Sequence, residues 1–300
     1  FVPGLSDDVS GLIVLKIVNS LSIKIADVIV RVDSAVELRR FHDIGFYKAF
    51  VIKKSLKAHC RLKHTIGLPP NFAFDKNSFD TQNWQLAATG TRKVLRVGPP
   101  PKKGKADNIV VFNHDYGQGV MYQKSVIELF RRFIDQFLII NLLSRDRGFL
   151  LHASGVVWEG KGLCFAGLSG TGKSTLLDLF KDEVPRSCLL NDDRLALKDT
   201  GTTWRVFGTP WYGQSRVASS NSADVSAIFF IRHARHNFVR RLSAHEILPH
   251  LMVLGLLPLW DGEAVGRVLN MFGNFIKNVP AYELGFLPNK SALDLIKKTV

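Results

Sequence analysis

The chain has 300 residues, of which 46% are hydrophobic and 10% are aromatic. This is enough apolar surface to bury a core, so the composition excludes an intrinsically disordered chain. Forty Lys and Arg residues against 26 Asp and Glu residues give a net charge of +14. Such a charge favours anionic partners: a nucleotide, an acidic protein, nucleic acid or an anionic membrane surface. Charge alone does not choose among them.

The N-terminal third is expected to be rich in strands. Residues 21–32 alternate well enough for one or two strands, and Ile109 to Phe112 predicts another. Ser34 is a candidate cap for a helix from Ala35 to His42. Residues 98–108 contain three consecutive prolines and several glycines, which predicts a loop.

A basic stretch runs from Arg39 to Lys63 and carries eight Lys or Arg residues against one acid, Asp43. It has two interpretations, a docking face for an acidic partner or a solvated surface. Charge runs are usually solvated, so the second is favoured.

Three cysteines, Cys60, Cys164 and Cys188, lie far apart in the chain. Their odd number and spacing indicate neither a disulfide framework nor a zinc site, and a reducing cytoplasm is the expected location. Cys164 and Cys188 fall in apolar runs and are expected to be buried. The apolar runs at 11–18 and 137–143 are too short to cross a bilayer, so no transmembrane segment is expected.

A long helix is predicted from Met121 to Ser144. Apolar side chains recur there at spacings of three and four, which is the helical period; they are Val126, Phe130, Phe133, Phe137 and Ile140. We expect this helix to pack between the N-terminal part and the rest of the chain.

From Phe149 onward the pattern is α/β. We expect a hairpin of strands 156–158 and 163–166, a strand at 189–193 that ends in Asp192 and Asp193, and a hairpin of strands 195–199 and 203–207. Further expected elements are a strand at 225–231, a helix capped by Ser243 with Glu246, a helix at 263–276, a strand at 282–286 and a last helix from Ser291.

The most informative segment is Gly-Leu-Ser-Gly-Thr-Gly-Lys-Ser at residues 167–174, which fits the Walker A phosphate-binding pattern. Glycines allow backbone N–H groups to turn toward phosphate oxygens, a lysine supplies positive charge at the β- and γ-phosphates, and the last hydroxyl can join a Mg²⁺ shell. An apolar strand precedes the motif and an amphipathic helix follows it, as a P-loop requires. The predicted nucleotide-binding residues are Gly167, Ser169, Gly170, Thr171, Gly172, Lys173, Ser174 and Thr175.

A P-loop needs an acid at the end of a nearby strand to hold Mg²⁺ and order water. Asp192 and Asp193, about twenty residues after Lys173, are the candidates. A solvated acidic turn is the alternative. His152 lies 21 residues before Lys173, and a hairpin that doubles back would bring it near the phosphate loop.

Together, Leu151-His152-Ala153-Ser154, the hairpin, the P-loop and Leu-Leu-Asn-Asp-Asp-Arg resemble the catalytic domain of the HPr kinase/phosphorylase family. The likeness covers about residues 147–290 and is closer to HPr kinase-related proteins whose N-terminal half differs. It implies a P-loop kinase core of the HPr kinase/phosphoenolpyruvate carboxykinase-like type with a mixed sheet, ATP and Mg²⁺ as cofactors, and a homo-oligomer.

The resemblance also implies roles for the residues. Asp192 would take the proton of the attacking hydroxyl, Asp193 and Ser174 would hold the metal, and His152 would lie beside Asp192 and tune it, with Lys173 stabilising the transferring phosphoryl group. The family places a further metal-binding Glu downstream, where this chain has Gln214. If that Glu is lost, metal binding and catalysis weaken.

The division that follows is an α+β N-terminal recognition or assembly domain at 1–120, a connecting helix at 121–146 and an α/β P-loop kinase-like catalytic domain at 147–300. The leading function is ATP- and Mg²⁺-dependent phosphoryl transfer to a hydroxyl of a protein serine or a small molecule. A nucleotide-binding switch or pseudokinase is the alternative, and a nucleic-acid-associated ATPase is third. A zinc site at His233, His236, His245 and His250 is disfavoured because no Cys or acid completes it.

Overall fold

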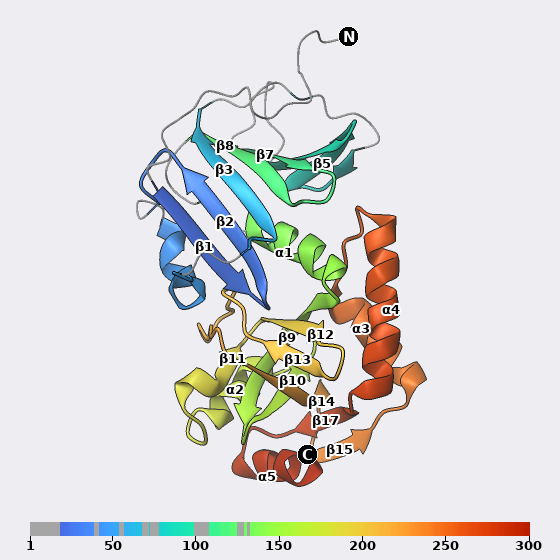
Figure 1. Ribbon diagram of the computed structural model, residues 1–300. Coiled ribbons are helices and arrows are strands. Elements are labelled where there is room, and N and C mark those ends of the chain that lie inside the picture. Colours follow the sequence, from blue (N-terminus) through green and yellow to red (C-terminus); the bar gives the residue numbers. More distant parts are fainter. Residues whose placement is uncertain are drawn as a thin grey trace.

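The computed structural model describes residues 19–38, 42–53, 57–67, 72, 78–98, 108–124, 129–130 and 133–300. The architecture is mixed α/β, with two β-sheets one above the other and helix α1 between them (Figure 1). No helix in these ranges combines the length and the apolar character needed to cross a membrane.

The first sheet contains eight strands from the N-terminal part of the chain. Strand β3 is parallel to both of its neighbours, β2 and β8, and the other pairs are antiparallel. In sheet order the strands are β1 (Asn19–Ile25), β2 (Val28–Ser34), β3 (Cys60–Ile66), β8 (Gln118–Gln123), β7 (Asn108–Asn113), β6 (Arg92–Val97), β5 (Trp84–Thr89) and β4 (Phe79–Asp80).

The predicted strands at 21–32 and 109–112 are confirmed by β1, β2 and β7. The predicted helix at 35–42 is wrong at its start, because the chain bends after Ser34, whose Oγ accepts the backbone N–H of Val36. The helical segment here is a 3₁₀-helix, η3 (His42–Phe50). The loop predicted at 98–108 connects β6 to β7, and its residues 99–107 lie outside the described residues.

The prediction of a long helix from Met121 to Ser144 is wrong at its start. Residues 121–123 belong to strand β8, where Met121 pairs with Val110 of β7 and His64 of β3, and α1 spans Ile134–Arg145. Ladder hydrogen bonds from two neighbouring strands override the helical spacing of the apolar side chains. The predicted location of the helix is confirmed: α1 is buried from Ile134 to Ser144 and packs between the two sheets.

The second sheet contains nine strands and is mixed. Strand β14 (Ser222–His233) is parallel to β10 (Lys161–Ala166) and to β17 (Ala281–Phe286). The remaining strands are β9 (Gly148–Trp158), β11 (Leu189–Asn191), β12 (Arg194–Asp199), β13 (Trp204–Phe207), β15 (Phe238–Arg241) and β16 (Gly255–Leu256). Both predicted hairpins are present, as β9–β10 and β12–β13.

Helices cover both faces of this sheet. One face packs against α3 (Ala244–Leu254) and α4 (Gly262–Asn278), and the other against α2 (Lys173–Phe180) and α5 (Lys290–Thr299). A short 3₁₀-helix, η4 (Arg186–Cys188), precedes β11. The predicted capping box of Ser243 and Glu246 is present at the start of α3.

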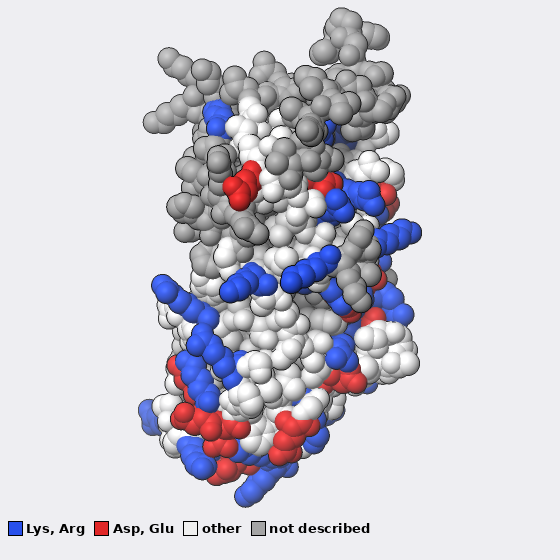
Figure 2. Space-filling view, turned by 60° about the vertical axis from the view of Figure 1, so that its left-hand side comes forward, with Lys and Arg blue, Asp and Glu red and all other residues white. Residues whose placement is uncertain are grey.

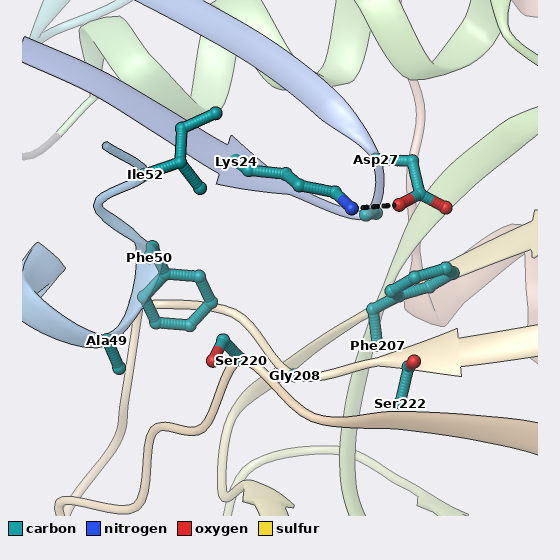
Figure 3. Close-up of a pocket in the computed structure, with 10 residues that line it drawn as sticks. Lys24, Asp27, Ala49, Phe50, Ile52, Phe207, Gly208, Ser220 and Ser222 are labelled. Atoms are coloured by element: carbon teal, nitrogen blue, oxygen red, sulfur yellow. Dashed lines mark ion pairs between the residues drawn. The ribbon is translucent and has the colours of Figure 1, made fainter. Parts of the chain in front are cut away.

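A pocket of about 220 Å³ lies where the two halves of the chain meet (Figure 3). Ala49 and Phe50, at the end of η3, face Phe207, the last residue of β13, and Gly208, which follows it. An ion pair of Lys24 and Asp27, with Nζ and Oδ1 2.8 Å apart, lies at its edge. The pocket contains none of the residues that the sequence predicts for nucleotide or metal binding.

On the face drawn in Figure 2, Lys and Arg side chains are spread over both halves and acidic side chains mix with them at the lower end. Within the basic stretch, Lys48, Lys53, Lys57 and Arg61 are exposed and Lys63 is half-buried. Arg39, Arg40 and Lys54 lie outside the described residues. The exposed positions fit a solvated surface and leave the docking interpretation open.

Candidate functional site

The segment Gly167–Ser174 connects strand β10 to helix α2, as the sequence predicts. Ala166 ends β10 and Lys173 begins α2. Because β10 runs parallel to β14, the segment leaves the sheet beside the carboxyl end of β14. Apolar side chains of α2 hold the helix against the sheet; they are Leu176, Leu177 and Phe180, all fully buried.

Glycine is required within this loop for two separate reasons. Gly170 and Gly172 have φ values of +83° and +100°, in the left-handed region that side chains disfavour. A Cβ on Gly167 would lie 2.5 Å from Thr171 Oγ1, so a side chain there would have to displace the Thr171 hydroxyl. Gly172 is also the N-cap of α2, which has no side-chain cap and no acid in its first turn.

The ammonium of Lys173 is buried and bound by the loop itself. Its Nζ donates to the carbonyl oxygens of Gly167 at 2.7 Å and Leu168 at 3.0 Å. The Thr171 hydroxyl donates to the same Leu168 oxygen at 2.8 Å. Ser169, Gly170 and Thr175 are exposed, and Ser174 is half-buried at the start of the helix. The loop is therefore closed on itself around one buried positive charge.

His152 and Asp193 lie next to this lysine because of strand register. Ala153 of β9 pairs with Ala166, the last residue before the loop, and His152 pairs with Arg194 of β12. As a result His152 Nε2 lies 3.7 Å from Asp193 Oδ1, and Arg194 Nε lies 3.7 Å from Asp193 Oδ2. The backbone of Asp193 is fixed as well, since its carbonyl accepts the N–H of Ala153 at 3.1 Å.

The electrostatics of this cluster couple the three side chains. Burial, and then the positive charge of Lys173, lower the pKa of His152, while Asp193 opposes this shift. Burial also lowers the pKa of Lys173, again opposed by Asp193. Asp193 is the acid that both shifts identify as the neighbour, and its side chain is 26% exposed, so it is accessible to a ligand.

The side chain of Asp192 is bound to the segment 211–217 and not to His152, and this corrects one expectation. His152 was expected beside Asp192, yet it lies beside Asp193. The buried carboxylate of Asp192 accepts backbone N–H groups from Gly213 at 2.8 Å, Ser215 at 2.6 Å and Val217 at 3.3 Å. Three such bonds are charge-assisted and fix the carboxylate against the segment 211–217.

Metal-ligating side chains are sparse in this cluster. Within the described ranges, no three His, Cys, Asp or Glu side chains gather closely enough to hold a metal ion. Gln214 is exposed in the segment that binds Asp192. Asp193 and the Ser174 hydroxyl remain as candidate Mg²⁺ ligands.

Two features of the site are absent from the sequence prediction. Arg194 follows directly on the acid pair, so adjacency in the sequence was its available signal. The binding of Asp192 by backbone N–H groups had no local signal, because the donors lie more than twenty residues further along the chain. The second feature separates the environments of the two acids.

A scan against protein-family models finds no match for this chain. A comparison with curated proteins finds no match either. Among solved structures, the chain is similar to the Hpr(Ser) kinase/phosphatase from Coxiella burnetii, at 13% sequence identity and a TM-score of 0.29. That similarity covers 50% of this chain and 95% of the other. A likeness this weak assigns neither family nor activity.

Proposed function

We propose that this protein binds a nucleoside triphosphate through the loop 167–174 and transfers its γ-phosphoryl group to a hydroxyl. One observation carries the proposal. The buried ammonium of Lys173 lies in a glycine-containing loop between a strand and a helix, and its charge acts on His152 of β9 and on Asp193 of the turn before β12. A P-loop with an adjacent acid is the arrangement that phosphoryl transfer requires.

The residues would divide the chemistry as follows. Backbone N–H groups at the start of α2 would bind the phosphate oxygens, and the Lys173 ammonium would exchange its bonds to the Gly167 and Leu168 carbonyls for bonds to phosphate. Asp193 is accessible and close to both Lys173 and His152, so it would accept the proton of the attacking hydroxyl. His152, with its lowered pKa, would be uncharged at neutral pH and would orient Asp193.

This assignment differs from the roles that the family resemblance implies, where Asp192 is the proton acceptor. The Asp192 carboxylate is buried and already accepts three backbone N–H bonds. Both of its oxygens are therefore bound to the backbone of segment 211–217, so it is not placed to meet an attacking hydroxyl. We infer that Asp192 orders the segment 211–217 and that Asp193 faces the reacting groups.

Mg²⁺ fits the residues that are present. This ion is usually held by one or two carboxylates together with phosphate oxygens and water, so Asp193 and Ser174 suffice as protein ligands. When bound, the ion would supply charge neutralisation at the transferring phosphoryl group. Every other step rests on the side chains described above.

A second function is favoured by one observation. Asp193 would have to serve both as metal ligand and as proton acceptor, because Asp192 is turned away and Gln214 stands in place of a further acid. A site with a single accessible acid suits a protein that binds nucleotide without efficient turnover. The nucleotide-binding switch therefore stays as the alternative.

Phosphate release separates the two functions. The wild-type protein is incubated with MgATP, alone and with a panel of seryl peptides and small hydroxyl acceptors, and transfer is followed by radiolabel. The enzyme predicts transfer that Asp193→Asn abolishes and that Asp178→Asn, at an exposed acid on α2, leaves unchanged. Binding of MgATP without transfer or release supports the switch, and neither binding nor release contradicts both.

The N-terminal region, 1–120, would recognise the phosphoacceptor or another copy of the chain, since the candidate nucleotide site lies entirely in the C-terminal part. The three free cysteines fit a reducing cytoplasm.

A further inference from the structure

A buried carboxyl group joins the N-terminal half of the chain to the segment that fixes Asp192. Asp135, in α1, is 2% exposed, and its Oδ2 accepts hydrogen bonds from Tyr47 Oη and Trp211 Nε1. Tyr47 belongs to η3 and Trp211 opens the segment 211–217, and both are buried. Two elements separated by more than 160 residues thus share one acceptor atom.

Trp211 is directly connected to the acid pair. Two residues after it, the N–H of Gly213 donates to Asp192 Oδ1 at 2.8 Å, and the N–H of Ser215 donates to Oδ2 at 2.6 Å. Any displacement of Trp211 would therefore move the donors that hold the Asp192 carboxylate.

A second connection runs in parallel just before Trp211. Asn191 Nδ2 donates to the carbonyl of Thr209 at 2.8 Å. The Oδ1 of the same Asn191 accepts the backbone N–H groups of Asp193 and Arg194, both at 2.7 Å. The segment from Thr209 to Val217 is thus bonded to the turn 191–194 on both sides of Trp211, and the turn carries Asp193 toward Lys173.

We propose that Asp135 is a positioning residue for the candidate site, acting with Tyr47 and Trp211. Their hydrogen bonds hold the segment 211–217 in the arrangement that turns Asp192 away from the phosphate loop and leaves Asp193 facing it. The N-terminal half, through η3, thereby sets the geometry of a site to which it contributes no reacting group. The consequence for catalysis rests on the proposed phosphoryl transfer, whereas the ordering of the segment does not.

The test uses two variants that remove one donor each. Tyr47→Phe removes a single oxygen atom, and Trp211→Phe removes the indole N–H and shortens the ring. Trp204→Phe is the matched control, because Trp204 Nε1 also donates in a part-buried bond, to Asn274 Oδ1 at 3.0 Å, outside the segment. Amide hydrogen exchange is measured on the full chain at Gly213, Ser215 and Val217.

Loss of one of the two buried bonds to Asp135 should speed exchange at these three amides by about tenfold in both variants. The control should leave them unchanged relative to the amides of β17. Unchanged exchange in Tyr47→Phe and Trp211→Phe, or equal acceleration in Trp204→Phe, overturns the proposal. If Trp211→Phe does not fold, Tyr47→Phe decides alone.

Kinetics supply the second readout. With MgATP as the probe, both variants should lower kcat for phosphate release by about tenfold and leave the KM for ATP within twofold, since the nucleotide loop is untouched. Faster exchange in a protein whose wild type releases no phosphate would support the ordering role and refute the proposed function. Normal kcat with normal exchange would refute the positioning role alone.

Discussion

The imidazole of His152 and the carboxylate of Asp193 face each other near loop 167–174, with Nε2 and Oδ1 3.7 Å apart. Asp192, the preceding residue, points to the backbone of segment 211–217 instead. Two adjacent acids therefore have opposite environments, one accessible and one buried. This asymmetry gives them separate roles that substitution can distinguish.

Asp192→Asn should destabilise the protein more than Asp193→Asn. An amide NH₂ in place of one Asp192 oxygen would face a backbone N–H donor, which costs about 2 kcal/mol for a buried, unsatisfied group. Urea unfolding of the two variants measures the difference. Equal stabilities, or a larger loss for Asp193→Asn, would show that the three backbone bonds to Asp192 contribute little.

The two variants should separate again in metal dependence. Asp193→Asn should lose the Mg²⁺-dependent part of nucleotide affinity, whereas Asp192→Asn should keep it at a temperature where the variant is folded. Calorimetry with ATP in the presence and absence of Mg²⁺ makes the comparison. A stronger Mg²⁺ effect of Asp192→Asn would reverse the assignment of the two acids.

The pKa of His152 should respond with opposite signs to two of its charged neighbours, Lys173 and Asp193. Lys173 lowers this pKa and Asp193 raises it, on top of the lowering that burial causes. Lys173→Ala should therefore raise the pKa of His152 toward its ordinary value, and Asp193→Asn should lower it further. NMR titration of the ring protons, assigned with His152→Gln, measures both shifts. Shifts of the same sign would contradict the arrangement.

A buried histidine in the first sheet should make stability depend on pH. His64 is 1% exposed between Ser34 Oγ and Gln123 Oε1, and burial lowers its pKa to about 4. Below the ordinary pKa of 6.5 the unfolded chain binds a proton that the folded chain does not. The free energy of unfolding should therefore fall by about 3 kcal/mol as the pH drops from 6.5 to 4.

His64→Gln should remove this contribution. The difference in unfolding free energy between wild type and variant is measured across that pH range, so that other titrating groups cancel. A difference that is independent of pH would mean that His64 is protonated in the folded protein, with the buried bonds rearranged around a charge.

The three thiols should differ in reactivity. Burial raises the pKa of Cys164 to about 12 and also raises the pKa of Cys60, whereas Cys188 is partly exposed in η4. A thiol reagent at neutral pH should label Cys188 first and the other two only after unfolding. Labelling of Cys188→Ser in the folded state at the wild-type rate would contradict this order.

Local patterns in the sequence predicted the elements around the site. The hairpin β9–β10, the loop that follows β10 and helix α2 follow from short-range signals: apolar runs, turn glycines and a helical period. The capping box of Ser243 and Glu246 predicted the start of α3 for the same reason. These features depend on neighbours within a few residues.

Features that depend on distant partners were missed. Residues 121–123 were predicted as helix and are strand, since β3 and β7 supply their pairing. The same holds for the acid pair, because the donors that turn Asp192 away come from segment 211–217. Asp135 is a lone acid within an apolar helical stretch, which weakly indicates a buried polar contact. Its partners Tyr47 and Trp211 were not predictable from the sequence.

Calorimetry of MgATP binding tests the central claim most directly. Wild type, Lys173→Ala and Lys181→Ala are compared after each is shown to be folded; Lys181 is an exposed lysine paired with Asp178 at the end of the same helix. Binding in wild type and Lys181→Ala, with binding lost in Lys173→Ala, is the expected result. Equal affinity in Lys173→Ala and wild type would contradict the assignment of loop 167–174 as the nucleotide site.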